Sequence, residues 1–365
     1  MVQLLLSAKH GTRLALTGLL MLAGVFSSDV FARDKSKPTE FQVPELLLDG
    51  GRKLTFERSF SADRDVKTKR GFWTKAFDLV VGKPDLHFLV RPYSVASDSR
   101  GRVIVTDPGA VGVHIFDFAD QKYKFISRRD KGKNSMLAPQ CVALDDQDNI
   151  YVTDSESGKI FVFDADGKFK RAIGALKGGE GFFKRPTGIA IDTTEQRIYV
   201  SDTLRNKVFV LDMQGSVLKT IGQNGTSAGE FNFPTELRLD GKDLVVVDAM
   251  NFRVQALDRS GQFEYAVGKI GDEMGTMFRP KGIGIDSEDH LYIVDGLRGI
   301  VQVFNREGQL LYYFGQKGTG FGEFRLPTGL FIDKNDHVFV VDSYNGRVQE
   351  FQYHGLKQQA KGGIQ

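Results

Sequence analysis

The chain has 365 residues, of which 41% are hydrophobic and 26% charged, and its formal net charge is +3. This composition suffices for a large core and excludes a wholly disordered chain, and the small net charge argues against a dedicated nucleic-acid-binding protein. The single cysteine, Cys141, excludes an internal disulfide, a cysteine-based zinc site and covalent attachment of c-type haem.

Residues 1–32 have the pattern of a secretory signal peptide. Basic residues precede an apolar run over 14–26, and Val30 and Ala32 supply the small side chains expected at a cleavage site. An uncleaved membrane anchor is the alternative, but this run is short for a hydrocarbon core of about 30 Å. The pattern therefore predicts cleavage after Ala32 and an exported protein, periplasmic or extracellular. We expect no transmembrane span after this cleavage.

The next segment, 33–76, shares no pattern with the rest of the chain. Basic residues cluster around Trp73, the only tryptophan: Arg64, Lys67, Lys69, Arg70 and Lys75. We interpret the segment as a basic arm or as an accessory hairpin packed on the last repeat. A docking arm for an acidic partner or a membrane surface is the alternative.

A unit of about 47 residues then repeats six times. Each unit opens with a proline before a short apolar run: Pro92, Pro139, Pro186, Pro234, Pro280 and Pro327. A second apolar run in each unit ends in an aspartate: Asp107, Asp154, Asp202, Asp248, Asp295 and Asp342. Matched units at one period indicate a repeat fold.

Each unit is expected to form four short strands. In the third unit these lie over 188–192, 197–202, 207–212 and 217–222, which are rich in β-branched and aromatic residues. The first three runs are almost continuously apolar, so both faces of each sheet must be covered. These features predict an all-β, six-bladed β-propeller of four-stranded antiparallel blades over 77–353, followed by a C-terminal tail over 354–365.

The last unit, 327–353, supplies only three strands. The segment 77–82 has the composition of a fourth strand and stands ten residues before Pro92. We therefore predict that 77–82 pairs with the last unit and closes the ring, which removes the exposed sheet edges.

These units resemble the NHL-repeat family. Its pattern of spaced glycines, a phenylalanine and a proline, then an Asp-x-x-Asn-x-Arg-Val loop, is present in the last unit as Gly322, Phe324, Pro327, Asp342, Asn345, Arg347 and Val348. The resemblance covers 77–353, although the first unit lacks the Asn/Arg loop. It implies a propeller whose function is set by its loops rather than by its fold.

Members of the family include modules that hold proteins or RNA on the top face, which is the face of the repeat-proline loops. A related propeller lyase holds zinc with histidines around the axis. No three of the five histidines after residue 32 are expected to converge there from their positions: His87, His114, His290, His337 and His354. A lactonase-type calcium site would need inward Glu, Asn and Asp, and Glu236 is the one obvious candidate. We therefore expect no metal, no cofactor and no catalytic residue.

Two charged residues stand on the innermost strand of the fourth unit. Glu236 and Arg238 occupy positions where other units carry mainly glycine or alanine, and residues two apart on a strand share a face. They predict a polar anchor for a ligand at the channel mouth. A mutually satisfied pair is the alternative, because a buried charge without a partner is costly.

Basic residues also recur on the top face. Arg91, Arg185 and Arg279 each directly precede a repeat proline in alternating units, and Arg205 and Arg298 stand in neighbouring loops. They predict a basic mouth for a ligand that carries carboxylate or phosphate groups. In the alternative, the aliphatic part of each arginine side chain packs against the protein and its guanidinium group pairs with a structural aspartate.

The sequence therefore predicts an exported, non-enzymatic binding scaffold that uses its top-face loops to hold a protein, peptide or glycan. We expect a monomer that binds no nucleic acid. The alternative function is a hydrolase or lyase with its site at the mouth of the central channel.

Overall fold

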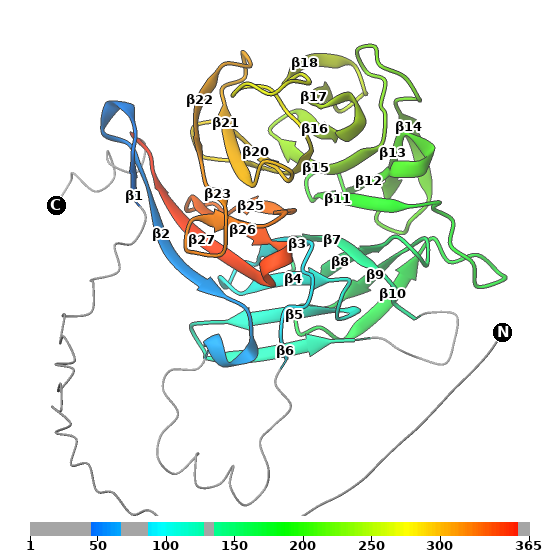
Figure 1. The fold of residues 1–365 in the computed structure, drawn as a ribbon. Coiled ribbons are helices and arrows are strands. Elements are labelled where there is room, and N and C mark those ends of the chain that lie inside the picture. The colour runs from blue at the N-terminus through cyan, green and yellow to red at the C-terminus, as the bar shows by residue number, and fades with distance from the viewer. Residues whose placement is uncertain (1–44, 67–86, 128–134, 357–365) are drawn as a thin grey trace, which may run out of the picture. The chain divides into compact units, whose positions relative to one another are not determined.

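The computed structural model describes residues 45–66, 87–127 and 135–356. Within these ranges the chain forms six antiparallel sheets arranged as the blades of a propeller (Figure 1). The proposed signal peptide over 1–32, the segment 77–82 and most of the C-terminal tail lie outside the described residues. No helix in the described ranges is long and apolar enough to cross a membrane.

Blades 1 to 5 each have four strands, which follow one another in chain order from the inside of the ring to the outside. Blade 1 consists of β3 (Ser94–Ser97), β4 (Val103–Asp107), β5 (Gly112–Asp117) and β6 (Lys122–Ile126). Blade 2 consists of β7 (Pro139–Leu144), β8 (Ile150–Asp154), β9 (Lys159–Phe163) and β10 (Phe169–Ile173). Blade 3 consists of β11 (Pro186–Asp192), β12 (Arg197–Asp202), β13 (Lys207–Asp212) and β14 (Val217–Ile221).

Blades 4 and 5 continue the same order. Blade 4 consists of β15 (Pro234–Asp240), β16 (Asp243–Asp248), β17 (Arg253–Asp258) and β18 (Phe263–Val267). Blade 5 consists of β19 (Pro280–Ile285), β20 (Leu291–Asp295), β21 (Ile300–Phe304) and β22 (Leu310–Phe314). Short elements lie between these strands and in the segments that flank them: β23 (Gln316–Lys317), β24 (Glu323–Phe324), η1 (Asp49–Gly51), η2 (Asp63–Val66), η3 (Thr203–Arg205), η4 (Ala249–Asn251) and η5 (Ser343–Asn345).

Blade 6 joins the two ends of the described chain. Its strands are β25 (Leu330–Ile332), β26 (His337–Asp342), β27 (Arg347–His354), β2 (Lys53–Phe60) and β1 (Glu45–Leu47). The six inner strands contact one another in chain order, and β25 then contacts β3, so the ring is closed. The predicted six-bladed propeller is confirmed.

The identity of the closing strand differs from the prediction. An N-terminal strand does pair with β27, but it is β2, and not 77–82, that occupies this edge from Lys53 opposite His354 to Phe60 opposite Val348. The other edge of β27 pairs with β26, so no edge remains for 77–82. The propeller therefore begins within 33–76, the segment interpreted as a basic arm or as an accessory hairpin packed on the last repeat. In the described part of this segment β1 and β2 form a hairpin, and β2 pairs with the last blade as one of its strands.

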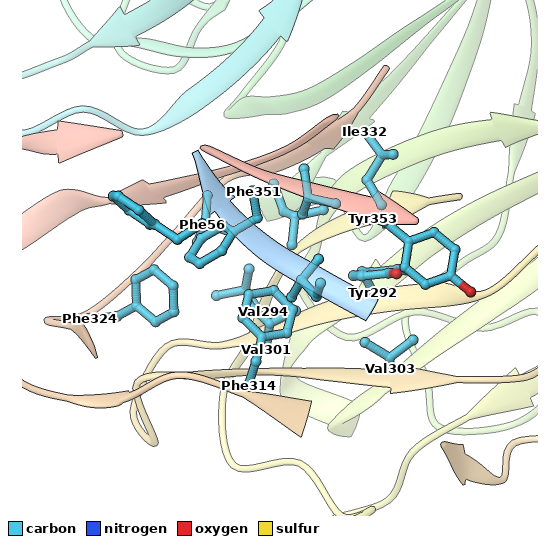
Figure 2. Packing of buried hydrophobic residues seen from close by; sticks show 14 residues of the cluster. Phe56, Tyr292, Val294, Val301, Val303, Phe314, Phe324, Ile332, Phe351 and Tyr353 are labelled. Atoms are coloured by element: carbon cyan, nitrogen blue, oxygen red, sulfur yellow. The ribbon is translucent and has the colours of Figure 1, made fainter. Parts of the chain in front are cut away.

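Alternating burial explains why β2 closes the ring. Leu54 and Phe56 are buried and pack with residues of blades 5 and 6, including Phe351 and Tyr353 (Figure 2). The Phe56 and Phe351 ring centroids lie 5.6 Å apart, and Phe60 is 1% exposed. A strand that buries one face against the ring contributes apolar stabilisation as well as hydrogen bonds.

The repeat residues serve the same local geometry in several blades. Proline is suited to the first residue of an inner strand because it has no N–H to donate. Pro139, Pro186, Pro234 and Pro280 each pair with the aspartate that ends the second strand, and each register then shifts by a bulge. Gly188 follows such a proline, and a Cβ there would lie 2.2 Å from the Thr235 carbonyl oxygen, so glycine lets the inner strands of blades 3 and 4 approach.

Candidate functional site

One inner strand brings two charged side chains to the central channel. Glu236 and Arg238, on β15, form an ion pair in which Arg238 Nη2 donates to Glu236 Oε1. The same guanidinium donates to the carbonyl oxygens of Leu330 at 2.9 Å and Leu237 at 3.0 Å. Arg238 therefore links the inner strands of blades 4 and 6 while it partners Glu236.

Burial controls the protonation of Glu236. Its side chain is 3% exposed, and the loss of solvation raises the pKa of the carboxyl group to about 7, although the charge and hydrogen bond of Arg238 act in the opposite direction. The carboxyl group is therefore near its titration midpoint at neutral pH. Arg238 Nε is also buried, and it has no hydrogen-bond partner in the described part of the chain.

Basic side chains meet at the top mouth of the channel. Lys281, on β19, has its pKa lowered to about 8, first by burial and then by the charges of Arg279 and Arg185. Burial raises the pKa of the Tyr93 hydroxyl, and the charges of the same two arginines oppose this rise. We call the group of Arg185, Arg279, Lys281 and Tyr93 the top cluster; it combines residues of blades 1, 3 and 5.

Lys281 is a member of this cluster that the sequence reasoning missed. Arg185 and Arg279 stand directly before a repeat proline, and Glu236 and Arg238 stand two and four positions after one. The residue directly after each proline also differs between units: Tyr93, Gln140, Thr187, Thr235, Lys281 and Thr328. Comparison at this position would have found the single lysine.

The backbone beside Arg185 and Arg279 is held firmly. The N–H groups of Lys184 and Arg185 donate to the carboxylate of Asp202 at 2.8 and 2.9 Å. Asp295 accepts in the same way from Phe278 at 2.8 Å and from Arg279 at 3.2 Å. Both aspartates are fully buried, so they anchor the loops, while the two arginine side chains have no ion pair or hydrogen bond in the described ranges.

The other predicted arginines are engaged by their surroundings. Arg298 donates to the carbonyl oxygens of Gly271, Glu273 and Thr276, which fixes the loop before Arg279. Arg205 lies 3.4 Å from Asp202 and over the rings of Phe182 and Phe209. Arg91 lies over the Tyr344 ring at 4.7 Å. These contacts give each of the three a structural role in its loop.

The histidines contact local partners, and His87 and His114 both lie beside the rings of Tyr123 and Phe125. His290 and His337 each contact the aspartate four residues earlier at 2.9 Å, in the turns of the opposite face. His114 Nδ1 lies 2.7 Å from the Tyr123 hydroxyl, and His354 lies 3.0 Å from the Thr55 hydroxyl. Among the described residues, no three His, Cys, Asp or Glu side chains form a group able to hold a metal ion.

These features define the class of protein as a six-bladed propeller with a charged channel. The model of a family described as "6-bladed beta-propeller" matches residues 94–200, 190–267 and 279–361, so the chain belongs to that family. No curated protein matches the chain.

Several solved structures share the fold. A Bacteroides thetaiotaomicron protein of unknown function is 16% identical with a TM-score of 0.57, and the match covers 85% of this chain and 84% of that chain. An auxiliary nutrient binding protein from the same organism is 11% identical with a TM-score of 0.56, over 73% and 70%. A catalytically inactive virginiamycin B lyase from Staphylococcus aureus, solved with quinupristin, is 14% identical with a TM-score of 0.52, over 72% and 94%. At these identities the likeness concerns the fold alone.

Proposed function

We propose that the protein is an exported, NHL-type binding scaffold without enzymatic activity, and that its top cluster holds an anionic group of a protein, peptide or glycan. The observation that carries this proposal is the position of three cations at the same ends of the inner strands: Arg185 directly precedes β11, Arg279 directly precedes β19 and Lys281 lies on β19, with no ion-pair partner among the described residues. The backbone anchors at Asp202 and Asp295 fix the main chain at Arg185 and Arg279, from which the two exposed side chains extend.

Electrostatics explain why this arrangement favours an anion. The lowered pKa of Lys281 reflects in part the repulsion that Arg279 and Arg185 exert on its charge. A carboxylate or phosphate placed among the three relieves that repulsion and accepts charge-assisted hydrogen bonds. In this proposal Glu236 and Arg238 form the floor of the site, and Arg91, Arg205 and Arg298 support its rim.

Two structural neighbours bear on the choice between a scaffold and an enzyme. One structural neighbour is called an auxiliary nutrient binding protein, which agrees with a scaffold that captures a ligand outside the cytoplasm. Another is a virginiamycin B lyase, which favours the alternative of a hydrolase or lyase at the channel mouth. Capture of an unaltered ligand distinguishes the scaffold from the enzyme, because an enzyme would release a changed product.

The test uses glycan and peptide arrays in which each acidic probe has a neutral counterpart, made by methyl esterification or amidation. We expect the acidic member of a pair to bind, and Arg185→Glu or Arg279→Glu to weaken that binding at least about ten-fold, the scale of one charge-assisted hydrogen bond. Lys168→Glu makes the same charge change on an exposed turn of the opposite face and should have no effect. Equal binding of acidic and neutral probes, or unchanged binding by both arginine variants, would refute the proposal.

A further inference from the structure

The channel also opens on the face opposite the top cluster. A cavity of about 510 Å³ lies there, bounded by the inner strands of blades 1, 2, 3, 4 and 6 and by the turns that follow three of them. Its size falls within the range of small-molecule sites, roughly 300–1,000 Å³. We call it the lower cavity.

Small apolar side chains create this space. The position four residues after each repeat proline lines the cavity in five blades, and four of those residues are Ala96, Ala143, Ala190 and Phe331. Val142, Ile189 and Leu239 complete much of the wall. Three alanines in a ring leave room for a ligand, and the Phe331 ring offers it a flat apolar surface.

The fifth residue at this position is Arg238, which is the polar group at the inner end. Its side chain is 15% exposed, whereas its partner Glu236 is 3% exposed and does not line the cavity. Arg238 has five N–H groups. The hydrogen bonds described above use both N–H groups of Nη2 and one N–H group of Nη1. The Nε–H group and the second N–H group of Nη1 therefore have no acceptor in the described part of the chain.

The charges around the cavity indicate which acceptor fits. At pH 7.5, which is above the pKa of Glu236 of about 7, most of the Glu236 carboxyl group is ionised and neutralises Arg238. The rim carries aspartates held by their own turns: Asp98 by Arg102 at 2.6 Å, Asp145 by Asn149 at 2.8 Å and Asp333 by His337 at 2.9 Å. Two further rim carboxylates, Asp146 and Asp148, outnumber the single rim cation, Lys334. An anion therefore meets a negative rim and a guanidinium whose charge is already neutralised.

A neutral carbonyl oxygen is not repelled by the negative rim, and it needs no uncompensated positive charge on Arg238. It accepts from the second Nη1–H of Arg238, because Nε is itself buried, and it brings no second negative charge beside Glu236. The apolar walls would stabilise a body of roughly ring size through the area removed from water. The opposite mouth, with Arg185 and Arg279, suits anions instead, so the two ends of the channel select different chemistry.

We propose that the lower cavity is a second binding site, which takes a small, mostly apolar molecule bearing a neutral carbonyl group, with that carbonyl on Arg238 and the apolar body against Phe331. The lower cavity shares Arg238 with the floor of the proposed top site, but Arg185, Arg279 and Lys281 do not line it, so binding there does not depend on the proposed function of the top cluster.

The experiment compares three probes with the same ring and different charge: phenylacetamide, phenylacetate and 2-phenylethylamine. Dissociation constants are measured at pH 7.5 by calorimetry or by ligand-observed NMR titration. We expect phenylacetamide to bind at least five-fold more tightly than either charged probe. Saturable binding that is strongest for the amine or the carboxylate would overturn the proposed chemistry, and no saturable binding of the amide would overturn the site.

Two variants locate the site. Arg238→Met combined with Glu236→Gln removes the donors without leaving an isolated buried charge, and Ala190→Leu fills the wall without touching the polar pair. Each should weaken amide binding at least five-fold, while Lys168→Glu, outside the cavity, leaves it unchanged. Unaltered amide binding in Ala190→Leu, which keeps the ion pair intact, would place the probe elsewhere and refute the proposal.

Discussion

The buried carboxyl group of Glu236 makes a quantitative prediction about stability. Its pKa is raised from an ordinary value of 4.5 to about 7, so between these pH values the folded chain holds a proton that the unfolded chain has released. The free energy of unfolding therefore falls as the pH rises through this window. A rise of about 2.5 in pKa, at about 1.36 kcal/mol for each unit, corresponds to about 3 kcal/mol.

Glu236→Gln tests this value because the amide keeps an acceptor for Arg238 and does not titrate. Urea unfolding of wild type and variant at pH 4.5, 5.5, 6.5 and 7.5 gives the difference in unfolding free energy at each pH. We expect this difference to shift by about 3 kcal/mol in favour of the variant from the lowest to the highest pH. The control is Glu307→Gln, at an exposed turn residue between β21 and β22, whose difference from wild type should stay flat. Parallel curves for wild type and Glu236→Gln would refute the reasoning from burial.

Two further predictions concern the fold. Gly188→Ala places a methyl group 2.2 Å from the Thr235 carbonyl oxygen and should destabilise the protein by about 1–3 kcal/mol or more, as overpacking does. The control is Gly178→Ala, whose added methyl group meets no atom within 4 Å and should leave the stability nearly unchanged. Thermal melts of both variants check this. Phe60→Ala empties a buried position on the closing strand and should cost about 3–5 kcal/mol in urea unfolding. Leu47→Ala, at a 77% exposed position on the neighbouring strand β1, should change stability by less than about 0.5 kcal/mol, and an equal cost at both positions would contradict the role given to β2.

The blade count could be predicted because one geometry is repeated. In each unit the repeat proline begins an inner strand, and the second-strand aspartate anchors the loop before that strand. Asp202 and Asp295 illustrate this, since each accepts from the two N–H groups before its proline. A constraint that recurs in every unit leaves a periodic signal in the sequence.

The closing strand could not be found by the same logic. The prediction required a glycine after the strand and a fixed distance to Pro92, which are the features of an outer strand inside a repeat. The strand β2 is instead the first long strand of the described chain, so no preceding blade fixes its distance from the next unit. Its signal is the alternation of Leu54 and Phe56 on one face and Phe60 beyond a bulge, which a search for the repeat pattern passes over.

The candidate site was visible only in part. Glu236 and Arg238 stood out because a charge at an inner position is rare in this chain. Pairing of Arg205 with Asp202 and of Arg298 with Asp295 follows the alternative that the sequence offered, in which a structural aspartate partners the arginine. The carbonyl oxygens that also hold Arg298, such as that of Gly271, could not be read from the sequence because the loop brings them close. Lys281 could have been identified by comparing the residues that directly follow each repeat proline.

The symmetry of the ring explains why a few residues that differ between the repeat units can define two sites. Six equivalent positions surround the channel at each level, so a single charged residue such as Arg238 faces small or apolar side chains from the other blades. The Glu236–Arg238 pair neutralises itself and separates a mouth with three cations from a cavity with apolar walls. The two proposals can therefore fail separately: charge reversal at Arg279 tests the anion site and leaves the lower cavity intact, whereas filling that cavity at Ala190 leaves the cations of the top cluster in place.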